Sequence, residues 1–102
     1  MLELRPNCEY CDADLPPSST DARICSYECT FCLDCVENLL KNVCPNCGGG
    51  FSQRPIRPAT EFRKGLSLEH QPASSDRKGL NYSKEEMAQF VALIKAIAPE
   101  KR

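Results

Sequence analysis

The sequence predicts a small α+β fold that is held together at its cysteines more than by an apolar core. Three observations lead to this fold class. The chain has 102 residues, and all eight of its cysteines fall within residues 8–47. The same half of the chain holds few large apolar residues, and so small a core rarely sustains a fold without cross-links or bound metal. The other half contains one amphipathic segment, so we expect a metal-dominated module, a linker and a C-terminal helix.

The cysteines are expected to bind metal rather than to form disulfides. The N-terminus shows no basic stretch followed by an apolar run, so no signal peptide is visible. No apolar run approaches the roughly 20 residues that a membrane span needs. We therefore expect a cytoplasmic protein with reduced thiols, in which clustered C-x2-C pairs are typical of metal sites. A redox C-x2-C motif would call for a βαβ context, which the sequence does not show.

The spacing of the cysteines allows three pairings. It reads C-x2-C-x13-C-x3-C-x2-C-x2-C-x8-C-x2-C, which is four close pairs and suits two tetrahedral zinc sites. In one pairing the four central cysteines share an ion, but iron–sulfur proteins with such runs have a different spacing followed by proline. In a second, the sites fill sequentially, with only Thr30 and Phe31 between them. In a third, the pairs interleave and brace one compact body.

The residues around the cysteines favour the interleaved pairing. The segment after Cys35 has apolar residues at helical spacing; these are Val36, Leu39, Leu40 and Val43. Residues 22–24 and 30–31 are suited to a short hairpin between the two sites. The predicted ligands of site 1 are Cys8, Cys11, Cys32 and Cys35, and those of site 2 are Cys25, Cys29, Cys44 and Cys47.

A protein with two such sites is not expected to be an enzyme. Structural zinc sites with four protein ligands leave no open position for water or substrate, so the predicted cofactors, two Zn²⁺ ions, serve the fold. The sequence shows no Ser-His-Asp set, no phosphate-binding glycine loop and no paired acid–base groups.

The order of the eight cysteines resembles that of the RING finger family, whose members bind two zinc ions through interleaved pairs. The resemblance covers Cys8 to Cys47 and departs from the common pattern at Cys29, where most RING fingers have histidine. It implies a RING-like zinc cross-brace, in the all-cysteine form, with a short hairpin and one helix. We assign this module to residues 1–50.

A closer resemblance covers roughly residues 1–58 and includes all eight cysteines. The stretches MLELRPNCEYC and ARICSYECTFCLDCV look like those of a family of short bacterial proteins catalogued as domain of unknown function 1272. This resemblance implies a bacterial cytosolic protein and supplies no activity.

The RING resemblance also implies a candidate surface for a protein partner. Eukaryotic RING fingers usually recruit a ubiquitin-conjugating enzyme through a shallow groove, and three apolar residues stand at its positions: Tyr10, Leu39 and Pro45. Only Pro45 matches the usual residue, and Gly48 replaces a residue that is often basic. All three could instead pack on the zinc scaffold. We expect a protein-interaction or adaptor module, with a ligase-like partner of a conjugating enzyme as the alternative.

Residues 51–82 are expected to form a linker that contains proline and arginine. Residues 1–48 hold three basic and eight acidic side chains, whereas residues 49–102 hold ten basic and six acidic ones. Nucleic-acid binding through the linker is a further alternative, but its cations are scattered among few aromatic residues, so nucleic acid is not an expected partner. His70, the only histidine, has no ligand partner nearby in sequence, and a metal role is not expected for it.

Residues 83–102 are expected to form an amphipathic helix and a short tail. Ser83 and Glu86 have the spacing of a capping box, and Pro99 should stop the helix near Ala98. The candidate partner-binding residues on its apolar face are Met87, Phe90, Val91 and Ile94. This face could pack on the zinc module, form a homodimer or enter the groove of a partner protein. The flanking cations are too few for a membrane-surface helix.

Overall fold

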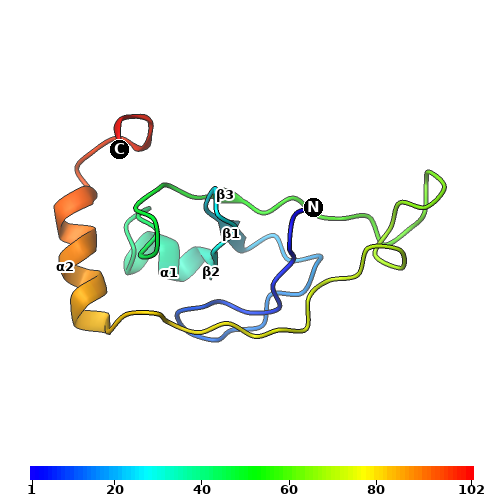
Figure 1. The fold of residues 1–102 in the computed structure, drawn as a ribbon, viewed down its shortest axis with the longest axis horizontal. Coiled ribbons are helices and arrows are strands. Elements are labelled where there is room, and N and C mark those ends of the chain that lie inside the picture. The colour runs from blue at the N-terminus through cyan, green and yellow to red at the C-terminus, as the bar shows by residue number, and fades with distance from the viewer.

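The computed structural model describes residues 1–102 and confirms the α+β fold class, with a short three-stranded sheet and two α-helices (Figure 1). The elements are β1 (Ala22–Ile24), β2 (Thr30–Cys32), α1 (Leu33–Asn38), β3 (Ser52–Gln53), α2 (Lys84–Ile94) and a final 3₁₀ turn (Pro99–Lys101). The strand order is β2-β1-β3, and both pairings are antiparallel. The molecule is elongated, with extents of 46 × 26 × 19 Å.

The expected hairpin is present and separates the two groups of cysteines. Arg23 pairs with Phe31 at its centre. Cys25 and Cys29 lie in the turn that joins the strands, where Glu28 adopts a left-handed φ of 68°. At the other end of the hairpin, Cys32 is the last residue of β2 and the N-cap of α1. The hairpin therefore directs one cysteine pair to its turn and another to the start of the helix.

The helix after Cys35 is shorter than its apolar pattern predicts. It ends at Asn38, because the chain turns sharply at Lys41 and Asn42, whose φ angles are 49° and 60°. The Asn42 side chain accepts a hydrogen bond of 2.8 Å from the Phe51 amide and so stabilises this turn. Leu40 and Val43 are still buried, but Leu39 keeps 48% of its surface exposed. The turn brings Cys44 back towards the hairpin.

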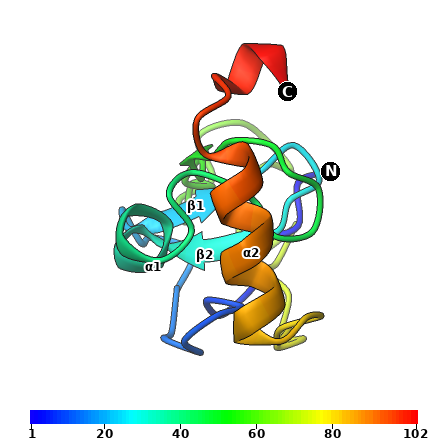
Figure 2. The same cartoon turned by 90° about the vertical axis from the view of Figure 1, so that its left-hand side faces the viewer.

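The apolar face of α2 packs on the cysteine-rich module within the same chain. Met87 and Val91 are only 2% and 5% exposed, and Phe90 and Ile94 pack partly buried against the same core. Viewed from the α2 end of the molecule, the helix lies in front of the β1–β2 hairpin (Figure 2). A Cβ atom at Gly48, where φ is 80°, would lie 3.5 Å from both Phe90 and Ile94. Of the three alternatives for this helix, the structure shows packing on the module.

The N-cap of α2 is confirmed, whereas its end comes earlier than expected. The Ser83 hydroxyl accepts a hydrogen bond of 3.1 Å from the Glu86 amide. The helix ends at Ile94 rather than near Ala98, and the chain then turns so that Pro99 packs against Gly50. Arg102 holds this tail in place by donating a hydrogen bond of 2.7 Å to the Asn42 carbonyl.

Replacing Ser83 with alanine should lower the stability of the helix cap. The Glu86 amide would lose its acceptor, and N-cap replacements of this kind cost about 1 kcal/mol. Urea unfolding at a fixed zinc concentration measures the change. Ser75→Ala is the matched control, since Ser75 is exposed and its hydroxyl makes no hydrogen bond. Equal midpoints for the two variants would contradict the prediction.

The segment between β3 and α2 folds back along the module. It leads away from the sheet, forms a loop at the end of the molecule opposite α2, and returns beside the N-terminal residues (Figure 1). The Ser74 amide donates to the Leu4 carbonyl at 3.0 Å. The buried Asn7 side chain donates to the Lys78 carbonyl at 2.7 Å and accepts from the Lys78 amide at 3.2 Å. We call residues 72–82 the return segment.

Arg54, the first residue after β3, is a fully buried cation. It is only 1% exposed, and its guanidinium donates to the carbonyls of Arg5, Leu15 and Pro16 at 2.8–3.1 Å. No carboxylate balances its charge, burial lowers its pKa, and its Nε atom has no hydrogen-bond partner. Arg54 therefore fixes the N-terminal segment to the chain that leaves β3.

Candidate metal centre

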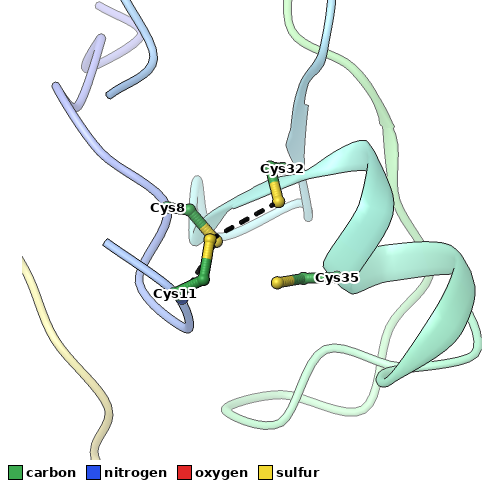
Figure 3. A group of neighbouring side chains, drawn as sticks. All are labelled: Cys8, Cys11, Cys32 and Cys35. Atoms are coloured by element: carbon green, nitrogen blue, oxygen red, sulfur yellow. Dashed lines mark hydrogen bonds between the residues drawn. The ribbon is translucent and has the colours of Figure 1, made fainter. Parts of the chain in front are cut away.

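Four cysteines converge at the start of α1. The Sγ atoms of Cys8, Cys11, Cys32 and Cys35 lie within 4.8 Å of one another. Figure 3 shows the four side chains directed towards a common point, two from the N-terminal turn and two from the β2–α1 junction. The Cys11 and Cys32 sulfurs are 3.8 Å apart. These are the four residues predicted for site 1.

The N-terminal turn has the backbone geometry that directs two sulfurs at one ion. The Asp12 amide donates to the Cys8 carbonyl at 2.9 Å, the Cys11 amide lies 3.5 Å from the Cys8 sulfur, and Asp12 takes a left-handed φ of 64°. The Asn7 side chain donates to the Asp12 carboxylate at 2.9 Å. Arg77, in the return segment, pairs with both Asp12 and Asp14 at 2.8 Å. Residues far along the chain thus brace this turn.

A second group of cysteines forms where the hairpin turn meets residues 44–49. The Sγ atoms of Cys25, Cys44 and Cys47 lie within 4.8 Å of one another. Cys29 lies outside that mutually close set, but it is near enough for the Cys44 and Cys25 thiols to affect its pKa. The Gly48 amide donates to the Cys44 carbonyl at 2.7 Å, which closes the turn. These four cysteines are the ones predicted for site 2.

Backbone amides point at the sulfurs of site 2 as well. The Tyr27 amide donates to the Cys25 sulfur at 3.3 Å, and the Gly49 amide donates to the Cys47 sulfur at 3.4 Å. Hydrogen bonds of this kind favour the thiolate form of a cysteine. Both groups therefore combine crowded sulfurs with nearby amide donors.

The thiols compete for protons within each group. The neighbouring Cys44 thiol lowers the pKa of Cys29 to about 5, and the Cys29 thiol in turn raises the pKa of Cys44. Burial raises the pKa of Cys25 to about 11 and also raises that of Cys35. The groups would thus retain protons that a divalent cation displaces on binding. Sets of soft sulfur ligands gathered at one point fit Zn²⁺.

The grouping follows the interleaved pattern of the sequence. The first and third pairs lie together, and Cys25 of the second pair lies with the fourth pair, so neither the sequential pairing nor the central four-cysteine cluster matches the geometry. Each group can hold one metal ion, and zinc binding by these residues stays a prediction. Sequence reasoning missed Asn7, Arg54 and Arg77, whose contacts span 38 to 71 residues and leave no local signal.

The candidate partner-binding residues lie in different environments. Tyr10 is half-buried, with the Lys84 ammonium 5.4 Å from its ring centre. Pro45 is buried and lines, with Met87 and Phe90, a cavity of about 170 Å³ beneath the start of α2. Leu39 alone of the three groove positions is largely exposed. Four more candidates, Met87, Phe90, Val91 and Ile94, contact the module itself.

Comparison with known proteins bears out the family resemblance. The model of a family described as "Protein of unknown function (DUF1272)" matches residues 1–57, which contain all eight cysteines. An uncharacterized protein of Rhizobium meliloti (strain 1021) is 61% identical over 64 residues, covering 63% of this chain and 76% of the relative. No solved structure matches the chain. No helix has both the length and the hydropathy that a bilayer crossing requires.

Proposed function

We propose that this chain, which belongs to the DUF1272 family, binds two structural zinc ions and acts as a protein-interaction module without chemistry of its own. The observation that carries the proposal is the convergence of seven cysteines into two groups, with Cys29 beside the second, each group suited to one ion. When all four ligands of a zinc ion come from the protein, no position is left for a substrate. The zinc ions would then build the scaffold, and function would lie on its surface.

The apolar residues that remain exposed mark where a partner would bind. Because α2 turns Met87 and Val91 inwards, its outer side presents Leu93, which is 78% exposed. Ile97, just beyond the helix, is 42% exposed. Leu39 adds an exposed apolar residue on the module itself. We propose the outer side of α2 as the principal contact for an unidentified protein partner or a second copy of the chain.

Charge placed on the outer side of α2 should abolish this interaction. Leu93→Asp introduces a carboxylate that would have to be desolvated in an apolar contact, and such a change costs several kcal/mol. Affinity capture from bacterial lysate compares it with wild-type protein, and sedimentation equilibrium tests self-association. Ser75→Asp is the matched control, because it adds the same charge at an exposed position in the return segment, away from α2. If the Leu93→Asp protein still captured a partner or still dimerised, the proposal that the outer side of α2 is the contact would be wrong.

The ligase-like alternative has weaker support. Lys84 lies over Tyr10 and Pro45 is buried under the start of α2, so a conjugating enzyme would have to displace the helix. The zinc-loaded protein is expected to leave the discharge of a ubiquitin conjugate unchanged. A zinc-dependent acceleration of that discharge would replace the adaptor proposal with the ligase.

Nucleic-acid binding has little to support it either. Three of the linker's cations are occupied inside the chain: Arg54 and Arg57 donate to backbone carbonyls, and Arg77 pairs with carboxylates. Contact with phosphate groups depends on free cations and falls steeply with added salt. We expect no binding to RNA or DNA at physiological salt, and steeply salt-dependent binding in a filter assay would overturn this expectation.

A further inference from the structure

A third group of metal-ligating side chains lies in the loop at the end of the molecule opposite α2 (Figure 1). Ligand atoms of Glu61, Glu69 and His70 lie within 4.8 Å of one another, and all three residues are exposed. The His70 Nε2 atom contacts a carboxylate oxygen of Glu61. The group contains the only histidine of the chain, and it joins two positions that are separated in the sequence.

The loop that carries these residues is closed by its own hydrogen bonds. Ser67 is 2% exposed, and its carbonyl accepts from the His70 and Gln71 amides at 3.1 and 2.9 Å. Its hydroxyl accepts from the Glu69 amide at 3.2 Å. At the base of the loop, Arg57 donates to the carbonyls of Gln71 and Leu2, each at 2.7 Å. The backbone therefore holds Glu69 and His70 facing Glu61.

The close approach of the Glu61 and Glu69 carboxylates is electrostatically unfavourable when no cation is bound. Two carboxylates placed this close repel each other unless a cation lies between them. A divalent ion bound by the imidazole and both carboxylates would balance their charge. Imidazole and carboxylate ligands suit zinc and similar first-row ions.

We propose that Glu61, Glu69 and His70 form a third metal site, which takes a divalent transition ion such as Zn²⁺. The site differs in kind from the two cysteine groups. It has three protein ligands and is exposed, so water completes its coordination and the ion exchanges readily. It lies outside residues 1–57, and its ion would stabilise the loop without being needed for the fold.

Zinc stoichiometry measured on the untagged full-length protein tests this site. We expect a third zinc equivalent in equilibrium dialysis, weaker than the first two and visible in native mass spectra as free zinc is raised. His70→Ala and Glu69→Gln should each weaken the third equivalent by about 10- to 100-fold and leave two ions bound. Glu100→Gln, which removes an exposed carboxylate elsewhere, should leave all three equivalents unchanged.

Cobalt separates this proposal from the proposed function. Cobalt in the cysteine groups gives sulfur-to-metal charge-transfer absorption, whereas cobalt at Glu61, Glu69 and His70 does not, because no thiolate is present. Loss of the sulfur bands alone would count against the two-zinc module and not against the third site. The absence of a third zinc equivalent, or a third equivalent that persists in His70→Ala, would overturn the third site.

Discussion

Chelation of the bound metal is expected to unfold residues 1–57, not merely to empty two sites. The buried apolar residues of this module are few, and four of its best-buried side chains are themselves predicted ligands: Cys8, Cys25, Cys35 and Cys44. Structural zinc contributes on the order of 10–16 kcal/mol of apparent binding free energy per site, which exceeds the whole stability of a typical small domain. Circular dichroism followed during a chelator titration, alongside native mass spectrometry, measures the loss of structure against the loss of ions.

The interleaved arrangement predicts that the two ions depend on each other. Cys35→Ser removes a ligand of site 1, yet we expect it to weaken site 2 as well, because β2 connects both groups. Cys44→Ser should act in the same way from the other side. Ser26→Ala is the control, since Ser26 is exposed beside Cys25 and makes no side-chain hydrogen bond. A Cys35→Ser protein that holds one ion with an intact half of the fold would show two independent sites instead.

Replacing Arg54 with methionine is expected to lower the free energy of unfolding by about 3 kcal/mol. Three carbonyls would lose their donor, and that of Leu15 would be left buried; a buried unsatisfied group costs roughly 1–3 kcal/mol. Methionine keeps much of the apolar volume, so the loss reports on the hydrogen bonds more than on packing. Urea unfolding of the zinc-loaded protein measures the change.

The comparison for Arg54 is Arg63→Met, in the loop beyond. Arg63 is exposed and its side chain makes no hydrogen bond, so its replacement should stay within about 0.5 kcal/mol of the wild-type protein. A similar small change for Arg54→Met would mean that water replaces the guanidinium at the carbonyls. The buried charge would then contribute little to the connection between the N-terminal segment and β3.

The parts of the fold that could be predicted from the sequence are those set by neighbouring residues. Strand pairing between residues 22–24 and 30–32 follows from a short turn, and the N-cap at Ser83 follows from its spacing to Glu86. The end of α1 could not be predicted from apolar spacing, because it depends on a turn that brings Cys44 to Cys25. Local helical preference gave way there to a contact between distant residues.

The long-range contacts carry no sequence signal of comparable strength. Asn7 contacts Lys78, and Arg77 braces Asp12, across 65 or more residues. The cluster at Glu61 and His70 was equally hidden, since only the closure of the loop makes them neighbours. Polar residues in a segment without periodicity look like a solvated linker until the fold supplies their partners.

The interleaving of the cysteine pairs has a consequence for how the protein is made. During translation, Cys8 and Cys11 leave the ribosome first but have no partners until Cys35 emerges. Site 1 can then close, whereas site 2 must wait for Cys47. The ion pair between Asp12 and Arg77 can form only when the thirty residues after Cys47 have also been synthesised. If the two groups bind zinc as proposed, the nascent chain passes through a period in which its thiols are exposed and free zinc must already be available.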